Sequence, residues 1–514
     1  MPQLRDSGNH PISDTSGTAP TRSAEESGIA SGRPDRFDRI FGIETEYGVS
    51  VTGGDAPDDA GLVAMEMFAP VVSRTRSTNT YLGNGSRLYL DVGSHPEYAT
   101  AEARDPMDAL AQDLAGERVM RRLALHAQER LRERHGTDLH VHLYKNNADS
   151  AGHSFGCHEN YLVRRYVPLT MIEQQLLPFL ITRQIFTGAG RMTSEGFQIT
   201  QRADFLDEGV SSATTRARPM VNTRDEPHAD PDAYRRLHVI IGDSNRSQFA
   251  TWMKLATTHL VLCVMESALR HGRPTGFESC AMADPNAANR AVSRDLSCRG
   301  ARLQLADPAA FRRDAARADG GADYGMSALA LQYRYCTVVE RWLETHGDAA
   351  DRSLGRTRAR MVVRQWRGIL DAVAAGAFDA LADRVDWVAK RRLLEALTSR
   401  RPDVSQARLA QIDLDYHDIA NGGTYDALVS HGAMRTLLDD EAVQQAVLEP
   451  PAGTRAALRG RFVHAAQAAG AHYACDWTRL TLTAPVRRES VLLDPSDDPP
   501  TAFSRPLMPA FKYP

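Results

Sequence analysis

Two segments near the N-terminus alternate apolar and polar residues, as a β-strand with one buried face does. They are Arg39–Val51 (RIFGIETEYGVSV) and Arg87–Glu102 (RLYLDVGSHPEYATAE). Because side chains two apart point the same way, Glu44 and Glu46 share one face of the first segment. By the same rule, Tyr89 and Asp91 share one face of the second. Acids on one face of a sheet need a cation to neutralise them, and clustered oxygens suit Mg²⁺ with substrate phosphates. The pattern therefore predicts the floor of a metal–nucleotide site.

Helical spacing of apolar residues covers much of the remaining chain. A long amphipathic helix is predicted at Pro106–His135, with acids near its start. A shorter helix at Leu62–Ala69 is expected to end at Pro70, because proline cannot donate a backbone hydrogen bond. Further helices are predicted at Phe249–Arg270, Met326–Glu344, Ser353–Ala375, Arg384–Leu397 and Arg455–Ala469. Further strands are predicted at Leu139–Leu143, His158–Val163, Leu237–Ile241 and Asp476–Leu482.

The composition changes along the chain and suggests four parts. Residues 1–35 are rich in Ser, Gly, Thr and Pro and bury too little to offset ordering entropy, so they are predicted to be a disordered extension. A main domain, which would contain the predicted metal–nucleotide site, is expected at 36–445, with a surface excursion at Asp307–Asp323. A small C-terminal domain is expected at 446–493, followed by a Pro-rich tail at 494–514.

The bulk composition fits a soluble globular enzyme, with 42% hydrophobic and 25% charged residues among 514. The net charge of −4 gives no indication of nucleic-acid or membrane binding. Six cysteines lie far apart without a CxxC pair, which argues against a zinc site or a disulfide framework. No apolar run reaches the ~18–20 residues of a membrane span, and the N-terminus has no signal-peptide pattern. We therefore predict a cytoplasmic protein.

The acidic residues have two interpretations each. Asp91 is either a general base beside bound metals or a further metal ligand or structural hydrogen-bonder. Glu44, Glu46 and Glu97 are either Mg²⁺ ligands or solvated acids on an exposed strand face.

His158 lies on one strand face with Asn160 and is either a ligand or a satisfied polar group. The neighbouring Cys157 is expected to be a small buried thiol rather than a nucleophile.

An arginine-rich stretch precedes the strand predicted at Leu237–Ile241. Arginine binds phosphate and carboxylate through a two-pronged fork, so the stretch is either a clamp for anionic groups or a solvated charge cluster. His238 shares a strand face with Arg236, the last arginine of the stretch, and remains a candidate ligand. No Gly-rich phosphate loop is present. The arginines are Arg216, Arg218, Arg224, Arg235 and Arg236.

Several longer motifs together resemble one protein family. They are GIETEYGV, SRLYLDVGSHPEYATAE, KNNADSAGHSFGCHENYL, GVSSATTRARP, NTRDEPHAD and RRLHVIIGDSN. They are similar to the Pup ligase/Pup deamidase family, which is related to glutamine synthetase, and the likeness runs from about Arg39 to about Leu493. The resemblance implies an α+β fold: a glutamine synthetase-like, curved, mostly antiparallel sheet backed by helices, with a small C-terminal domain.

The family has two activities on one scaffold. The ligase uses ATP and Mg²⁺ to join the C-terminal glutamate side chain of the small protein Pup to a lysine of a target protein, through a γ-glutamyl phosphate. The deamidase converts a C-terminal Gln of Pup to Glu and removes Pup from targets. This chain is similar to the ligase branch in reading LYLDVGSHPEYATAE and GCHEN, and in having only about thirty residues between Val51 and Tyr81.

The resemblance also implies roles for single residues. It assigns Mg²⁺ ligation to Glu44, Tyr89 and Glu97. The catalytic base would be Asp91. ATP contacts would come from Arg87, Thr100 and Trp477, and further metal or phosphate ligands from Glu46, His158 and His238.

Three alternatives to the ligase remain: a deamidase/depupylase on the same scaffold, a specialised carboxylate–amine ligase acting on a small molecule or dedicated peptide, and a catalytically inactive binding module. The intact acids argue against the last. The N-terminal extension, the excursion at Asp307–Asp323 and the tail after Asp494 depart from the family pattern. These departures leave room for a specialised substrate.

Overall fold

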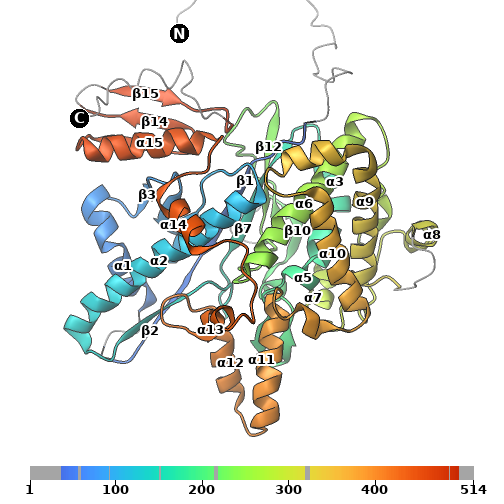
Figure 1. The fold of residues 1–514 in the computed structure, drawn as a ribbon, viewed down its shortest axis with the longest axis horizontal. Coiled ribbons are helices and arrows are strands. Elements are labelled where there is room, and N and C mark those ends of the chain that lie inside the picture. Colours follow the sequence, from blue (N-terminus) through green and yellow to red (C-terminus); the bar gives the residue numbers. More distant parts are fainter. Residues whose placement is uncertain are drawn as a thin grey trace, which may run out of the picture. The chain divides into compact units, whose positions relative to one another are not determined.

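An eight-stranded sheet forms the centre of the fold, with helices α2 (Pro106–His135) and α6 (Gln248–Arg270) packed across one face (Figure 1). The structure is a computed structural model that describes residues 36–55, 59–91, 93–149, 152–212, 218–318, 325–484 and 487–496. The predicted extension at 1–35, Arg216 and most of the tail lie outside these residues. Within the described residues, no helix is long and apolar enough to cross a membrane.

The central sheet is antiparallel except between its first two strands, so the mostly antiparallel α+β prediction is confirmed. Its strands in spatial order are β10 (Glu208–Ser211), β11 (Pro219–Asn222), β12 (Tyr234–Val239), β7 (Cys157–Arg164), β1 (Phe41–Glu46), β5 (Pro96–Ala99), β4 (Arg87–Leu90) and β3 (Asn79–Tyr81). Smaller sheets pair β2 (Gly48–Thr52) with β6 (His140–Tyr144), β8 (Arg191–Thr193) with β9 (Gly196–Gln198), and β13 (Tyr473–Cys475), β14 (Arg479–Leu482) and β15 (Arg488–Val491) with one another.

Strand β1 has the predicted two faces. Phe41 and Ile43 are buried in the core beneath α6, whereas Glu44 and Glu46 lie on the other face. An antiparallel sheet can keep one face accessible in this way. The alternation therefore places the acids away from the helical layer, on the face available to a ligand.

Each of the two strand-like segments predicted from the sequence is broken into two strands, which corrects that expectation. Arg39–Val51 divides at Tyr47 into β1 and β2, and β2 leaves the central sheet to pair with β6. Arg87–Glu102 divides at a turn after Leu90 into β4 and β5, which pair with each other. The alternation of apolar residues continues through Tyr47, so periodicity alone cannot detect the change of partner.

The other predicted elements are found, with shifted ends, and the helix at 106–135 has the predicted bounds. The excursion at Asp307–Asp323 contains a helix, and the sequence patterns missed several short elements after residue 400. The remaining helices are α1 (Ala60–Thr75), α3 (Leu169–Met171) with a π-helical turn (Ile172–Leu176), α4 (Leu177–Thr182), α5 (Gln184–Thr187), α7 (Pro285–Arg294), α8 (Pro308–Ala318), α9 (Ala328–Ser353), α10 (Ala359–Ala374), α11 (Asp386–Arg400), α12 (Gln406–Asp415), α13 (Thr424–Ser430), α14 (Asp440–Leu448) and α15 (Arg455–Ala468). Short 3₁₀ turns lie at Ala203–Phe205, Glu278–Cys280 and Phe378–Leu381.

Helix α1 continues through Pro70, so the prediction that it ends there is wrong. A proline inside a helix leaves the carbonyl four residues earlier without its usual donor. That carbonyl belongs to Glu66, and Nη2 of Arg130 on α2 donates to it at 2.6 Å. Nε of Arg130 also donates to the Glu66 carboxylate at 2.6 Å. A side chain from a neighbouring helix therefore replaces the missing backbone bond.

We expect Arg130→Ala to weaken α1 by about 1–3 kcal/mol, because it leaves the Glu66 carbonyl unpaired. Arg134→Ala is the matched control, since Arg134 contacts Glu66 through its carboxylate and not its carbonyl, donates otherwise to the Arg130 carbonyl of its own helix, and has a side chain that is 53% exposed. The control should change local stability by less than about 1 kcal/mol. Amide hydrogen exchange within α1 measures both. Equal protection in the two variants would contradict the role given to Arg130.

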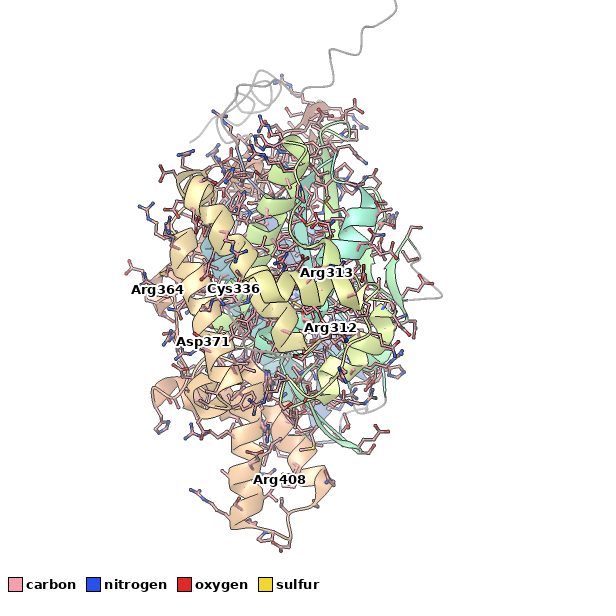
Figure 2. All side chains as sticks on the ribbon, turned by 90° about the vertical axis from the view of Figure 1, so that its right-hand side faces the viewer. Arg312, Arg313, Cys336, Arg364, Asp371 and Arg408 are labelled. Carbon is pink, nitrogen blue, oxygen red and sulfur yellow. The ribbon has the colours of Figure 1, made fainter. Side chains whose placement is uncertain are left out.

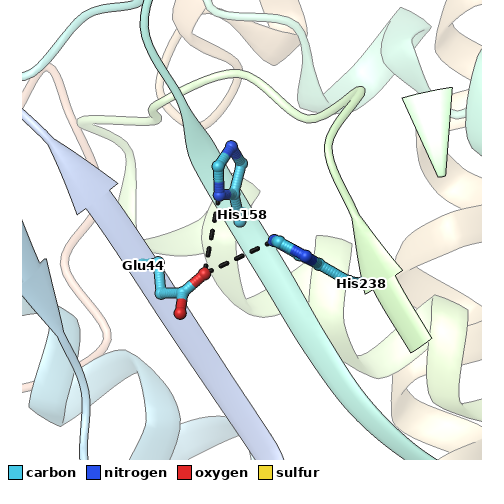
Figure 3. Close-up of side chains that lie close together, drawn as sticks. All are labelled: Glu44, His158 and His238. Carbon is cyan, nitrogen blue, oxygen red and sulfur yellow. Dashed lines mark ion pairs between the residues drawn. The ribbon is translucent and has the colours of Figure 1, made fainter. Parts of the chain in front are cut away.

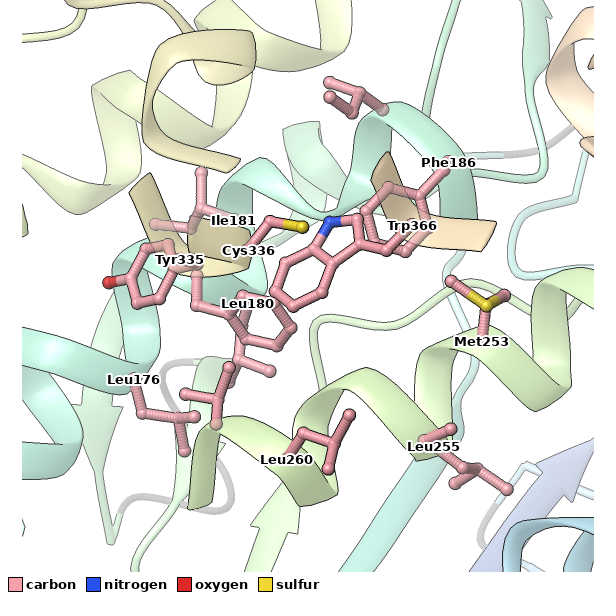
Figure 4. Packing of buried hydrophobic residues seen from close by; sticks show 14 of the residues in the cluster. Leu176, Leu180, Ile181, Phe186, Met253, Leu255, Leu260, Tyr335, Cys336 and Trp366 are labelled. Carbon is pink, nitrogen blue, oxygen red and sulfur yellow. The ribbon is translucent and has the colours of Figure 1, made fainter. Parts of the chain in front are cut away.

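The main core lies between the sheet and the helices α4, α6, α9 and α10. Almost every side chain of α6 is buried, as expected of a helix enclosed on all sides. Figure 4 shows Trp366 of α10 packed against Phe186 and near Cys336 of α9, and its indole nitrogen donates to Gln332 at 3.0 Å. The outer face of this helical layer carries exposed charges, such as Arg312 and Arg313 on α8 (Figure 2).

The C-terminal segment, comprising α15 and the sheet β13–β14–β15, has a small hydrophobic cluster of its own. Tyr81 of β3 inserts into that cluster and joins it to the central sheet. The residues from Arg36 onward form one compact unit. The domain limits given above remain a prediction.

Candidate functional site

Three carboxylates converge at the end of strands β1, β4 and β5. Glu46 on β1 is the cross-strand partner of Glu97 on β5, and Glu97 also pairs with Tyr89 on β4. Oxygens of Glu46, Asp91 and Glu97 all lie within 4.8 Å of one another. The Tyr89 hydroxyl donates a short hydrogen bond to Glu97. Residues that the sequence pattern placed on two separate strands thus form one acidic cluster.

Asp91 lies just beyond β4, in the turn that leads to β5, and is exposed. Its backbone N–H donates to the carbonyl of His95 at 3.0 Å, and Ser94 donates to the Asp91 carbonyl at 3.0 Å. Gly93 has a φ of +100°, a left-handed conformation that favours glycine. The His95 ring stacks on Phe155, with ring centroids 4.8 Å apart. A fixed turn therefore presents the Asp91 carboxylate to solvent beside the buried Glu97.

A second cluster lies next to the first along β1. Oε2 of Glu44 is 3.5 Å from Nδ1 of His158 and 3.4 Å from Nε2 of His238 (Figure 3). His158 comes from β7 and His238 from β12, two successive strands beside β1. Nε2 of His238 is buried and, although close to Glu44, forms no hydrogen bond within the described part of the chain. Burial lowers the pKa of His238 to about 4, so at neutral pH its ring is uncharged.

Both clusters fit a divalent cation. Burial and the nearby charges of Glu44 and Glu46 raise the pKa of Glu97 well above its ordinary value. Without a cation, these acids repel one another in a poorly solvated place. Carboxylate and phenol oxygens in one cluster, and a carboxylate with an unpartnered imidazole nitrogen in the other, are suitable ligands. The donor atoms present are therefore compatible with Mg²⁺, which stays a prediction at this site.

A pocket that is partly open to solvent adjoins the Glu44 cluster. Gly42 lies on the same face of β1 as Glu44, and a Cβ added there would lie 3.7 Å from Asn160 and 3.8 Å from Thr100. The missing side chain leaves space on the strand surface. The C-terminal segment closes one side of the pocket with Trp477 and Arg455. The lining also includes Glu44, Thr100, Glu102, Asn160, Pro227, His228 and Arg236.

Thr100 and Trp477, two of the three residues predicted to contact ATP, line this pocket. The third, Arg87, does not; its guanidinium lies 4.1 Å from the ring centre of Tyr89, and its Nε donates to Asn79. Arg87 therefore lies beside the acidic cluster instead. The predicted site residues are thus grouped around β1, while their individual roles remain predictions.

The arginine-rich stretch does not act as one group. Arg236 faces the pocket and donates to Asn160 at 2.9 Å. Arg235, the next residue on β12, donates to the carbonyl of Val167. Arg224 is exposed and pairs with Glu226, while Arg218 is exposed and donates to the carbonyl of Ser154. Among the described arginines of this stretch, only Arg236 lines the pocket.

Sequence reasoning missed Glu102, His228 and Arg455, which also line the pocket. Glu102 is buried and held by Arg455 and Arg459 of α15. One signal was available: Arg455 and Arg459 lie four residues apart, on one face of a helix with many apolar residues (RAALRGRFV), and buried arginines are usually paired with an acid.

The chain matches the Pup-ligase protein family model over residues 39–481. It is 63% identical to a Pup–protein ligase of Bifidobacterium longum over 510 residues, covering 99% of this chain and 100% of that protein. It is 64% identical to that of Bifidobacterium dentium over 497 residues, covering 97% of each chain. The family model stops short of the N-terminal extension and the C-terminal tail, whereas the alignment with the B. longum protein covers almost the whole chain.

Two solved structures are similar to the whole fold. One is the complex of the prokaryotic ubiquitin-like protein Pup with its ligase PafA, at 36% identity and a TM-score of 0.80, covering 92% of each chain. The other is the Pup ligase PafA in complex with ADP, at 37% identity and a TM-score of 0.73, covering 90% of this chain and 95% of that one. With the family match and a relative of 63% identity along nearly its whole length, this chain belongs to the Pup-ligase family.

Proposed function

We propose that this protein is an ATP-dependent ligase that joins the C-terminal glutamate side chain of Pup to a lysine of a target protein. The observation that carries the proposal is the arrangement along one face of β1. A pocket at Gly42 is followed by the Glu44 cluster and then by the Glu46–Asp91–Glu97 cluster. A nucleotide lying along this face would place its terminal phosphate among the acids.

Mg²⁺ is the cation we expect at both clusters. Glu46, Glu97 and Tyr89 would hold it in one, and Glu44, His158 and His238 in the other. Bound there, Mg²⁺ would neutralise the negative charge of the phosphates during transfer. Among the described residues the two clusters consist of acids, the Tyr89 phenol and two imidazoles, with Arg87 and Arg236 beside them, so a bound cation would reduce the repulsion of an anionic phosphate.

The reaction has two bond exchanges. The γ-carboxylate of the Pup glutamate attacks the γ-phosphorus of ATP, ADP leaves, and a γ-glutamyl phosphate forms. The lysine amine then attacks the acyl carbon, phosphate leaves, and the amine proton passes to Asp91. A free lysine has a pKa of ~10.4 and is almost entirely protonated at neutral pH, so a positioned base is needed to take the amine proton as the bond forms. Asp91 suits this role because it is exposed to an incoming side chain.

The direct test mixes the protein with ATP, Mg²⁺, Pup ending in Glu and a lysine-bearing protein. We expect a conjugate with the summed mass less one water, together with ADP and phosphate. Pup ending in Gln and a Pup–protein conjugate are run in parallel. Fast release of ammonia or Pup without ATP turnover, and without ligation, would favour the deamidase/depupylase instead.

Arg236→Ala should raise the KM for ATP by more than about tenfold, because charge-assisted bonds contribute roughly 1.5–3 kcal/mol. Arg235→Ala is the matched control: the same change one residue earlier, on a side chain that does not line the pocket. It should alter KM by less than about twofold. Steady-state kinetics at saturating Pup measure both. Equal effects of the two substitutions would mean that Arg236 does not contact the nucleotide.

A further inference from the structure

A buried carboxylate connects the central sheet to the C-terminal segment. Glu102, which follows β5, accepts from Nε of Arg455 at 2.7 Å and from Nη1 of Arg459 at 3.2 Å. A further, shorter bond joins Nη2 of Arg459 to the other carboxylate oxygen. Burial opposes the charge on Glu102, but Arg459 and Arg455 lower its pKa to about 2. The carboxylate is therefore ionised throughout the working range of pH.

This ion cluster is not what holds α15 on the sheet. Tyr81 packs into the hydrophobic cluster of the C-terminal segment with Leu458 and Phe462. The turn before β4 also lies close to α15, since a Cβ on Gly460 would be 2.3 Å from the carbonyl of Gly83. Buried ion pairs are weak contributors to stability, because removing the charges from water offsets most of their attraction. The ion cluster instead fixes the orientation of the groups that are hydrogen-bonded to its two arginines.

Those groups form one wall of the nucleotide pocket. Nη1 of Arg459 donates to the carbonyl of Trp477 at 3.2 Å, and its guanidinium lies 4.9 Å from the Trp477 ring centre. Nη1 of Arg455 donates to the carbonyls of His228 and Leu492, at 2.5 and 2.9 Å. Glu102 thus fixes two arginines, and each arginine fixes a segment that carries a pocket residue, Trp477 or His228.

We infer that Glu102 is a positioning residue for nucleotide binding, acting through Arg455 and Arg459 on Trp477 and His228. The inference rests on the proposed function, because it takes the pocket to be the ATP site. Nε and Nη1 of Arg455 are already bonded to the protein, so Arg455 supports the wall instead of binding phosphate with those groups. The two proposed metal clusters are not part of the hydrogen bonds that join Glu102, Arg455 and Arg459. The kcat at saturating ATP should therefore be unaffected.

The test is Glu102→Gln, which keeps the size of the side chain and removes its charge. We expect the Kd for ADP with Mg²⁺, measured by calorimetry, to rise at least tenfold. The kcat at saturating ATP and the KM for Pup should stay within threefold. The change in tryptophan emission on adding ADP should also shrink, with Trp477→Phe identifying the share that comes from this residue. If Glu102 had a purely structural role, the substitution would lower the melting temperature without raising the Kd for ADP more than it changes the kcat and the KM for Pup.

Glu266→Gln is the matched control, since Glu266 is also buried and held by an arginine, Arg39, but does not line the pocket. It should leave the Kd for ADP unchanged. If Glu102→Gln does not fold, Arg459→Lys gives the same comparison, because lysine retains the charge but lacks the fork. Wild-type affinity for ADP in a folded variant at either position would overturn the inference. ADP binding does not involve Pup, so a failure to ligate Pup would count against the proposed function alone.

Discussion

Replacing Asp91 by asparagine should reduce conjugation of Pup to a protein lysine by about 10²–10⁴-fold, the usual effect of losing a general base. ADP should bind with nearly unchanged affinity, because Asp91 is exposed at the end of β4 and does not line the nucleotide pocket. Asparagine keeps the shape of the turn, whose hydrogen bonds to His95 and Ser94 come from the backbone. The loss should therefore be confined to the transfer to the amine.

Rescue by a different nucleophile separates the two roles that the sequence left open for Asp91. Hydroxylamine is unprotonated at neutral pH, so its attack on the γ-glutamyl phosphate needs no base. With Asp91→Asn, hydroxamate should form at close to the wild-type rate. If Asp91 is instead a metal ligand, hydroxylamine will not restore turnover. Asp55→Asn changes an acid that follows β2, pairs with His135 and has a side chain that is 86% exposed, and this variant should be fully active.

Removing one carboxylate from each cluster should produce the second large effect. Glu44→Gln and Glu97→Gln should each weaken ADP binding in the presence of Mg²⁺ by more than about tenfold, since a charge-assisted contact contributes roughly 1.5–3 kcal/mol. Excess EDTA should abolish conjugation by the wild-type protein. Calorimetry with ADP, with and without Mg²⁺, measures how much Mg²⁺ strengthens nucleotide binding in each variant. Glu195→Gln, an exposed acid on the β8–β9 hairpin, should behave as wild type. Tight nucleotide binding in excess chelator would contradict the metal assignment.

The parts of the site that follow strand periodicity could be predicted from the sequence. Glu44 and Glu46 lie on the predicted face of β1, and His158 and Asn160 on the predicted face of β7. Register could not be predicted, because it depends on which strands pair. Only the structure places Glu97 opposite both Glu46 and Tyr89.

Long-range partners explain the remaining differences. Local sequence rules predicted that α1 ends at Pro70, but Arg130 from another helix supplies the missing hydrogen bond. Local rules also treated five arginines as one group, whereas Arg235 and Arg236 contact different parts of the protein. Glu102 carries no local signal of its own, because its partners Arg455 and Arg459 lie more than 350 residues away in sequence.

The crowding of Glu46, Asp91 and Glu97 has a consequence for protein engineering. In the metal-free protein these like charges oppose folding, so Glu97→Gln should raise the melting temperature while it impairs ligation. Natural proteins often give up stability at their working sites in this way. Selection for thermostability alone would then enrich inactive variants at this position. A library designed to stabilise the enzyme should keep these three acids fixed, or be screened with Mg²⁺ and nucleotide bound, when the repulsion is neutralised.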